Sequence, residues 1–320
     1  MKAVLLDADT LGNWQGQENH PGFIDLSSIS NLFDEFEIYP LTEPHQRLER
    51  CQNAQVIITN KVILDRELLA QLSNLKIIQL TATGMNNVDL DACQEFGIKA
   101  LNVEDYSTFT VAQLAFQFIL NFATRTIEHN ALVKSGAWQQ SRIFTLTNYP
   151  TIEVAGKTLL IIGQGNIGKR VAAMAEAFEM QVIFAQLPNR PQRDNQSPLM
   201  EAVQKADFIS LHCPLSADTH HLVDHTFLDL MKPSAYLINT ARGPIIDEEA
   251  LHSALKHRII AGAALDVLSQ EPPEKTNPLL SEPLDNLVIT PHIAWASAEA
   301  KQRLIAGMVA KLQKNQISLL

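Results

Sequence analysis

The sequence of 320 residues predicts an α/β protein with two doubly wound parallel sheets. Short apolar runs typical of buried strands alternate with segments of helical spacing. A glycine-rich turn, Gly163-Gln164-Gly165-Asn166-Ile167-Gly168, stands between an apolar run at 158–162 and a helical pattern at 167–178. Several polar residues downstream follow the ends of predicted strands. A chain of this length can hold two domains of medium size.

The first hundred residues predict a smaller doubly wound unit. Strands are expected at 2–6, 36–39, 56–59 and 75–80, with a helix at 64–72. Asn60 and the segment 81–87, which contains Thr83 and Gly84, follow two of these strands. Loops after parallel strands commonly bind ligands, and small residues with a glycine suit the capture of a carboxylate by backbone N–H groups. A plain surface turn explains either segment equally well.

The next stretch predicts the longest helix of the chain, at 106–125. Its apolar residues recur at helical spacing, which is typical of a buried connecting helix or a subunit contact. Residues 135–149 are polar, aromatic and irregular, and Trp138 lies among them. We interpret this segment as an excursion between the two units.

The glycine-rich turn has the context of a dinucleotide fingerprint, namely a strand before it and a helix after it. The first glycine allows the sharp turn, the second lets the backbone approach a pyrophosphate, and the third lets helix and strand pack closely. Backbone N–H groups and the positive end of the helix dipole then face the phosphates. The chain is therefore predicted to bind a dinucleotide.

The choice of dinucleotide stays open. The predicted strand at 181–184 ends near Gln186, where an NAD-specific site usually carries an acidic residue that holds the ribose 2′-hydroxyl. Gln186 can bind a hydroxyl but does not repel a 2′-phosphate, and Arg190 and Arg193 could pair with one. We therefore expect NAD or NADP.

Further strands are predicted at 207–213, 235–239, 261–267 and 287–290, with a helix at 247–256, and four candidate site residues lie at or just beyond strand ends. These residues are Arg242, Asp266, Glu271 and His292. Reduction of a 2-oxo acid needs a proton donor, which a histidine beside a carboxylate supplies, and an arginine that holds the substrate carboxylate through two parallel bonds. Each residue alone could be an ordinary loop residue, but their shared place at one sheet edge favours function.

Composition excludes several classes. The formal net charge is −10 and no cluster of Lys and Arg is present, so we expect no nucleic-acid partner. Cys51, Cys93 and Cys213 are widely spaced without a CxxC, which is typical of reduced thiols in a cytoplasmic protein rather than of a disulfide or metal framework. No apolar stretch reaches the roughly 18 residues of a membrane span, so no membrane contact is expected.

Taken together, these segments resemble the D-isomer-specific 2-hydroxyacid dehydrogenase family along nearly the full chain. The matching segments are 163–168, Asn-Thr-Ala-Arg-Gly at 239–243, Ala-Leu-Asp-Val at 264–267 with Glu271-Pro272, and Pro-His-Ile-Ala at 291–294. The resemblance implies two Rossmann-like domains with the active site in a cleft between them. It implies a discontinuous substrate-binding domain (1–101 and 293–320) and a dinucleotide-binding domain (102–292). It also implies a homodimer, with the 106–125 helix and the Trp138 excursion as candidate contacts.

The resemblance also implies roles for individual residues. Arg242 is expected to anchor the substrate carboxylate, Glu271 and His292 to form an acid–base dyad, and Asp266 to contact the nicotinamide. The expected cofactor-binding residues are Gly163, Gln164, Gly165, Asn166, Ile167, Gly168, Gln186, Arg190, Cys213, Pro214, Thr240, Ala241 and Asp266. The expected substrate-binding residues are Asn60, Thr83, Gly84, Arg242, His292 and Trp295.

Within the family the chain looks most like glycerate dehydrogenases, also called hydroxypyruvate reductases. The reasons are the segments 59–61, 81–87 and 295–297. We therefore expect NAD(P)-dependent reduction of hydroxypyruvate or glyoxylate to the D-2-hydroxy acid. Two alternatives remain: a dehydrogenase for another 2-oxo acid, and a dinucleotide-sensing interaction protein on the same scaffold. Gln186 departs from the family, since most members have Asp there, and Met85 with Phe109-Thr110 leaves the substrate side chain open.

Overall fold

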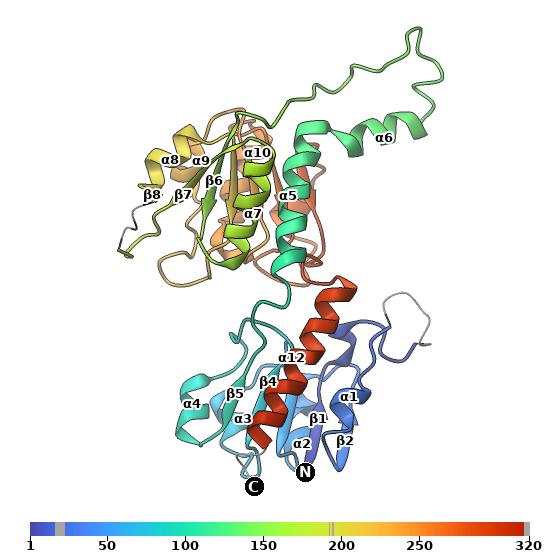
Figure 1. Ribbon diagram of the computed structural model, residues 1–320, viewed down its shortest axis with the longest axis vertical. Helices are drawn as coiled ribbons and strands as arrows, with labels where there is room; N and C mark the ends of the chain where they lie inside the picture. Colours follow the sequence, from blue (N-terminus) through green and yellow to red (C-terminus); the bar gives the residue numbers. More distant parts are fainter. Residues whose placement is uncertain (17–22, 192, 194, 317–320) are drawn as a thin grey trace. The chain divides into compact units, whose positions relative to one another are not determined.

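The computed structural model describes residues 1–16, 23–191, 193 and 195–316, and the chain divides into two compact units (Figure 1). The first unit comprises Met1–Ser107 and Ala296–Leu320, and the second comprises Thr108–Trp295. The predicted boundaries, after residues 101 and 292, lie a few residues before these two points.

The sheet of the first unit is parallel and has the strand order β2-β1-β3-β4-β5, which is the flavodoxin-like doubly wound order. The predicted strands are present with small shifts at their ends, and β5 is an edge strand that was not predicted. The strands of this sheet are β1 (Lys2–Leu5), β2 (Glu35–Ile38), β3 (Val56–Thr59), β4 (Ile77–Leu80) and β5 (Lys99–Leu101).

Mostly short helices cover this sheet. Alternate strand residues such as Val4 and Ile57 pack into one core with Leu68, Leu69 and Cys93 from the α3 and α4 side. The long helix α12 contacts α1, so a segment from the end of the chain completes the first unit. The helices are α1 (Ser27–Ser30), α2 (Arg47–Cys51), α3 (Arg66–Leu69), α4 (Leu90–Glu95) and α12 (Ala298–Gln316), with 3₁₀ turns η1 (Ala8–Leu11) and η2 (Pro44–Gln46).

The sheet of the second unit is also parallel, and its order is β12-β11-β10-β9-β6-β7-β8. Renumbered from β6, this is the Rossmann order 3-2-1-4-5-6 with one more strand at the far edge. The order reverses at β6, so the loop after β6 lies at the switch point where such sheets bind ligands. The strands are β6 (Thr158–Ile162), β7 (Gln181–Ala185), β8 (Gln196–Ser197), β9 (Phe208–Leu211), β10 (Tyr236–Asn239), β11 (Gly262–Leu265) and β12 (Leu287–Ile289).

The central strands of this sheet are buried on both faces, as expected for a parallel sheet. Leu159 and Ile161 of β6 belong to the core beneath α5 and α7, while Leu160 and Ile162 belong to the core beneath α8, α9 and α10. Alternation with a period of two therefore sends one strand into two separate cores. The helices are α5 (Thr108–Thr124), α6 (Thr126–Lys134), α7 (Asn166–Ala177), α8 (Leu199–Lys205), α9 (His225–Leu230), α10 (Glu248–Lys256) and α11 (Pro278–Ser281), with η3 (Gly243–Ile245) as a 3₁₀ turn.

The prediction that the 106–125 helix is the longest of the chain is wrong. The helix expected at 106–125 is present as α5, with 17 residues, but α12 has 19 and is longer. The length of α12 is hard to predict from the sequence because its apolar face is narrow. Its fully buried apolar residues are Ala300, Leu304, Met308 and Leu312. In the part of the chain that the structure describes, no helix is long and apolar enough to cross a membrane.

Candidate active site

The glycine turn after β6 has the geometry that its sequence predicts. Gly163 has a φ of +112°, and a Cβ there would lie 2.4 Å from the backbone carbon of His212. A Cβ on Gly168 would lie 2.1 Å from the carbonyl oxygen of Gly163, so only glycine lets α7 start this close to the strand. Gly165, in contrast, has open space around the position of its missing Cβ. The turn therefore leaves room for a ligand at its second glycine alone.

Residues around this turn fit a dinucleotide. α7 begins at Asn166, directly after Gly165, so the positive end of its helix dipole lies at this turn. At the end of β10, Thr240 Oγ1 is buried and has no hydrogen-bond partner among the described residues. An unsatisfied buried hydroxyl at the same sheet edge as the glycine turn is the kind of group that a bound ligand satisfies. Gln164 and Ile167 of the turn, with Cys213-Pro214 after β9 and Ala241 after β10, lie along the same edge.

The loop after β7 presents no carboxylate in the segment 185–191. Gln186 pairs through its backbone with Ser197 of β8, and its Nε2 donates to the carbonyl oxygen of Arg190 at 3.1 Å. Asn189 Nδ2 donates to Asp218 Oδ1 at 2.7 Å, so this neighbouring carboxylate is engaged by the loop itself. The loop therefore carries an amide and the arginine Arg190 where an acidic residue would select NAD.

Two side chains meet at the far end of the same edge. His292 Nδ1 lies 2.6 Å from Glu271 Oε2, and Leu268 N donates to Glu271 Oε1 at 3.0 Å. About 30% of the His292 side chain and 29% of the Glu271 side chain are exposed, so a small molecule can reach the pair. The backbone of His292 is left-handed, with φ of 53°, which is uncommon for a residue with a Cβ. Such conformations persist where the surroundings impose them, and they cluster at active sites.

Asp266 imposes that conformation. Its carboxylate is buried, and its Oδ1 accepts from Thr290 Oγ1 at 2.6 Å and from Ile293 N at 2.9 Å. Its Oδ2 accepts from Ala294 N at 2.9 Å, and its backbone oxygen accepts from His292 N at 2.9 Å. Burial raises the pKa of Asp266 above its ordinary value, although these hydrogen bonds oppose the shift. The carboxylate therefore holds the loop that carries His292, in addition to any contact with the nicotinamide.

Arg242 follows β10 at the same edge. Its Nη1 donates to the carbonyl oxygen of Ala241 at 2.7 Å, and no other hydrogen bond of the guanidinium is found among the described residues. Asn239, at the end of β10, is fully buried; its Nδ2 donates to the Arg242 carbonyl and its Oδ1 accepts from Ala241 N, both at 2.9 Å. Sequence reasoning did not assign this positioning role to Asn239. A polar residue at the end of an otherwise apolar strand is the signal that identifies it.

A second histidine at this edge is unsuited to proton donation. Burial lowers the pKa of His212 to about 4, so its imidazole is neutral near pH 7. Its Nε2 lies 2.8 Å from Ser210 Oγ. Burial likewise raises the pKa of the neighbouring Cys213 thiol to about 11, so this sulfur is not a nucleophile. His292 is therefore the histidine at this edge that suits acid–base work.

The second unit thus brings the glycine turn, Arg242, Asp266, Glu271 and His292 to the carboxyl ends of β6, β10, β11 and β12. Trp295 is the last residue of that unit. The remaining predicted substrate residues, Asn60, Thr83 and Gly84, belong to the first unit, where they follow β3 and β4.

Within the first unit these residues are held from behind. Asp7, buried at the end of β1, accepts from the backbone N–H groups of Asn60 (2.9 Å) and Lys61 (2.7 Å), and from Thr59 Oγ1 (3.0 Å). Thr83 Oγ1 donates to the carbonyl oxygen of Val103 at 2.9 Å. A substrate-binding role for Asn60, Thr83 and Gly84 stays a prediction.

Comparison with known proteins decides the family. Residues 116–294 match the model of the D-isomer specific 2-hydroxyacid dehydrogenase, NAD binding domain. The chain belongs to the D-isomer-specific 2-hydroxyacid dehydrogenase family. It is 42% identical over 319 residues to a putative 2-hydroxyacid dehydrogenase of Haemophilus influenzae, covering 98% of each chain. It is 37% identical over 314 residues to a glycerate dehydrogenase of Methylorubrum extorquens, covering 98% of this chain and 95% of the relative.

A solved structure shares the fold. An acyclic imino acid reductase in complex with NADPH and D-Arg superposes with a TM-score of 0.84 at 28% identity, covering 99% of this chain and 98% of that one. The predicted resemblance and the two Rossmann-like sheets are thereby confirmed. As a D-2-hydroxyacid dehydrogenase, the protein is an oxidoreductase of the CH–OH group that uses a nicotinamide dinucleotide.

Proposed function

We propose that this D-2-hydroxyacid dehydrogenase reduces hydroxypyruvate to D-glycerate, with glyoxylate as a close second substrate. The observation that carries the proposal is the His292–Glu271 pair, with 2.6 Å between Nδ1 and Oε2, at the edge that also carries the glycine turn and Arg242. The glycerate dehydrogenase relative, which matches over almost the whole chain, supports the choice of substrate.

In this proposal each residue has one task. The carboxylate of Glu271 holds Nδ1 of His292, which leaves Nε2 to donate a proton to the carbonyl oxygen of the 2-oxo acid. Glu271 also stabilises the positive charge of the imidazolium before the proton is transferred. The fork of Arg242 binds the substrate carboxylate through two parallel bonds and polarises the adjacent carbonyl. The bound dinucleotide supplies the hydride. In the reverse direction His292 accepts the hydroxyl proton.

We propose that both NADPH and NADH serve as cofactor. The loop after β7 carries Gln186 in place of a carboxylate that would repel a 2′-phosphate, and Arg190 can pair with that phosphate. The structural relative that was solved with NADPH supports this choice. Asp266 is proposed to orient the nicotinamide amide.

We propose a homodimer in which α6 and the segment after it pack against a second copy. This arm extends away from the sheet of its own unit (Figure 1). Its side chains leave large apolar areas in water: 89% of Phe144, 60% of Ile143 and 50% of Trp138 are exposed. Large apolar side chains exposed together on one arm are typical of a protein–protein interaction site.

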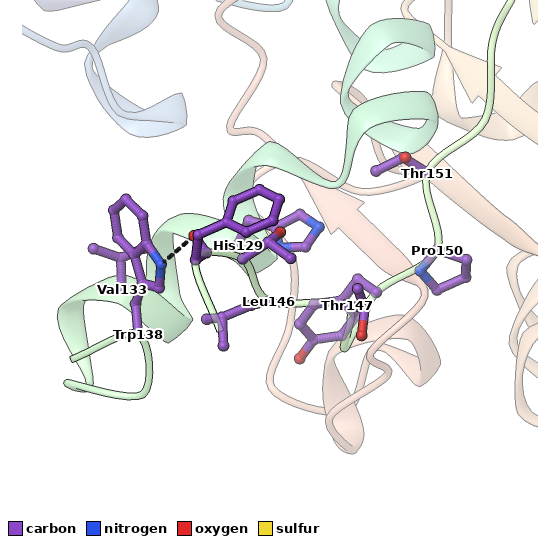
Figure 2. A pocket seen from close by; sticks show the side chains of 10 residues that line it. His129, Val133, Trp138, Leu146, Thr147, Pro150 and Thr151 are labelled. Atoms are coloured by element: carbon purple, nitrogen blue, oxygen red, sulfur yellow. Dashed lines mark hydrogen bonds between the residues drawn. The ribbon is translucent and has the colours of Figure 1, made fainter. Parts of the chain in front are cut away.

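The arm also has a shape that a partner can fill. A hollow of about 550 Å³ lies between α6 and residues 144–151. Trp138 Nε1 donates to the carbonyl oxygen of Phe144 at 3.0 Å, and Figure 2 shows the side chains that line the hollow. His129 packs edge-on against Tyr149, and both side chains line the hollow. Size-exclusion chromatography with light scattering should give the mass of a dimer, and Phe144→Asp should shift it toward the monomer. A monomeric wild-type protein would contradict this part of the proposal.

We also propose a cytoplasmic location. Cys51, Cys93 and Cys213 are free and buried in the structure, which is the state expected in a reducing compartment. Fractionation of the source cells tests this point.

The first test is turnover. NADPH and NADH oxidation is followed by absorbance with hydroxypyruvate, glyoxylate, pyruvate and 2-oxoisocaproate in parallel. We expect the highest kcat/KM with hydroxypyruvate, and the ratio for the two cofactors tests the role of Gln186 and Arg190. A clear preference for 2-oxoisocaproate or pyruvate would replace the substrate but keep the chemistry. Cofactor binding without turnover of any acid would favour the dinucleotide-sensing alternative.

A further inference from the structure

Glu248 connects the segment that follows Arg242 to the loop that carries Glu271. It is the first residue of α10, and its Oε1 accepts from Ser269 N at 2.6 Å. Its Oε2 accepts from Asn277 Nδ2 at 2.7 Å. Ser269 and Asn277 stand on either side of Glu271 in the chain, so one carboxylate grips both ends of the loop that carries the dyad carboxylate.

The other side of the connection is the Arg242 segment. Arg242 is followed directly by η3, and Glu248 comes immediately after the N-cap Asp247. Gly243 lies against the loop: a Cβ on it would be 2.0 Å from the carbonyl carbon of Leu268 and 2.4 Å from Ser269 N. The segment that carries the substrate anchor and the segment that carries Glu271 therefore touch backbone to backbone, and Glu248 bonds across the same seam.

An ordinary helix-end role does not explain these contacts. Asp247 caps α10 by accepting from the N–H groups of Glu249 and Ala250, so the cap does not need the carboxylate of Glu248. The favourable interaction of an acid with the helix dipole needs only charge near the first turn, and Glu249 supplies that as well. Neither capping nor the helix dipole therefore explains why both Glu248 oxygens accept hydrogen bonds from a loop that is more than 20 residues away in the sequence.

The loop needs such a tether. Residues 269–276 are all exposed to solvent, so little apolar contact holds them. Segments with few buried contacts open at low free-energy cost. Yet Glu271 must hold His292 to within a fraction of an ångström for proton transfer, since a displacement of about 1 Å can cost roughly 10²-fold in rate.

We propose that Glu248 is a positioning residue, which clamps the 268–277 loop to the Arg242 segment and so fixes Glu271 against His292. This inference rests on the proposed function of the dyad. The clamp acts on the proton donor through Glu271, which is one of two carboxylates that act on His292. The other is Asp266, whose position is set by its own bonds to Thr290, Ile293 and Ala294.

Four variants distinguish the effect of side-chain length at Glu248 from the effect of its charge. Glu248→Ala removes the clamp, and Glu248→Asp keeps the charge but shortens the side chain by one methylene, so it cannot span both partners. Glu248→Gln keeps the length and one acceptor oxygen for Ser269 N. Glu249→Gln is the matched control, because it removes the same charge from the same helix end and its side chain is exposed.

Two readouts are measured. Hydrogen–deuterium exchange by mass spectrometry reports the opening of residues 267–278 and needs no substrate. The pH profile of kcat/KM for hydroxypyruvate reduction reports the dyad. We expect Glu248→Ala and Glu248→Asp to exchange faster in this segment, to lose roughly 10–100-fold in kcat/KM, and to move the alkaline limb of the profile to lower pH. Glu248→Gln should be intermediate, and Glu249→Gln should match the wild type.

Three outcomes would overturn the clamp. The first is wild-type exchange in both Glu248→Ala and Glu248→Asp. The second is a fall in kcat with an unchanged pH profile that follows only the fraction of folded protein. The third is an equal effect of Glu249→Gln, which would assign the effect to helix-end charge. If Glu248→Ala does not fold, the comparison of Glu248→Asp with Glu248→Gln decides alone. A wild-type enzyme that turns over no 2-oxo acid would instead refute the proposed function, and exchange would still judge the clamp.

Discussion

Replacement of Asp266 by asparagine tests how far the site depends on a buried carboxylate. The substitution keeps the shape of the side chain and removes one acceptor. The asparagine oxygen can take the place of Oδ1 and keep the bonds from Thr290 Oγ1 and Ile293 N. The amide nitrogen then takes the place of Oδ2, 2.9 Å from Ala294 N, where two donors face each other.

The cost follows from this geometry. Loss of one bond to a charged acceptor, together with a buried N–H left unsatisfied, costs about 2–4 kcal/mol. Part of this is offset, because burial raises the pKa of Asp266 and removal of the charge relieves that desolvation. We expect a net loss of about 2 kcal/mol, which for a unit of this size lowers the Tm by roughly 4–8 °C. The loop between Thr290 and Ala294 also shifts, so kcat should fall by roughly 10²-fold.

Differential scanning calorimetry measures the first effect, and single-turnover kinetics with hydroxypyruvate measure the second. Thr290→Val is the matched control, because it removes one donor to the same carboxylate without leaving the Ala294 N–H unsatisfied, and it should cost less in both assays. A variant Asp266→Asn with wild-type Tm and wild-type kcat would refute the reasoning, since the buried carboxylate would then hold nothing that the reaction needs.

Three further changes have expected outcomes. His292→Gln should lower kcat by roughly 10²–10⁴-fold while cofactor still binds, as followed by nicotinamide fluorescence, and near-normal turnover would exclude His292 as the proton donor. Arg242→Lys keeps the charge but lacks the planar fork, so the KM for the 2-oxo acid should rise about tenfold or more, and an unchanged KM would argue against the anchor. Burial raises the pKa of Asp7, so the folded state binds its proton more tightly than the unfolded state and this stabilising contribution is lost as pH rises through the folded pKa. The wild type should therefore gain Tm relative to Asp7→Asn as pH falls from about 7 to 4, and a constant difference would contradict the assignment.

The strands could be predicted because a parallel sheet buries both of their faces. Residues 56–59 were predicted as a strand and are β3 with the same bounds, since all four are buried and apolar or hydroxyl-bearing. The strand expected at 261–267 is shorter, because β11 pairs only over Gly262–Leu265. Val267 and Leu268 remain buried without belonging to the ladder, so an apolar run reports burial rather than strand pairing.

The helix bounds were harder to predict, because an apolar pattern reports burial rather than helical hydrogen bonding. Residues 64–72 have helical spacing, but the helix α3 spans only Arg66–Leu69. Leu72 is buried after the helix ends, so it extends the apolar pattern without extending the hydrogen bonds. α6 was not predicted, because none of its residues is buried and its sequence therefore lacks an apolar stripe. Only a partner surface would give this helix a buried face, which agrees with the proposed dimer.

At the site, the order along the chain predicts that the proposed reacting residues share one edge, whereas it does not identify the residues that hold them. Arg242, Glu271 and His292 follow three different strands, and parallel strands bring their carboxyl ends to one edge. Glu248 stands at a helix start, where an acid is already explained by the dipole, so nothing in the sequence indicates its bond to Ser269. Its role depends on a contact between segments that only the folded chain brings together.

Both classes of residue answer one physical requirement. The reacting groups must project beyond the sheet to reach a ligand, and loops beyond a sheet are the mobile part of such a fold. The proposed acid–base pair, with 2.6 Å between His292 Nδ1 and Glu271 Oε2, cannot tolerate that mobility. In this chain Asp266 and Asn239 are buried polar groups at strand ends. The Asn239 side chain bonds the backbone of residues 241–242, and the Asp266 side chain bonds the backbone of residues 293–294. The geometry of the site therefore depends on buried polar groups at strand ends, together with the proposed Glu248 clamp, and substitution of these groups should disturb catalysis before it disturbs the fold.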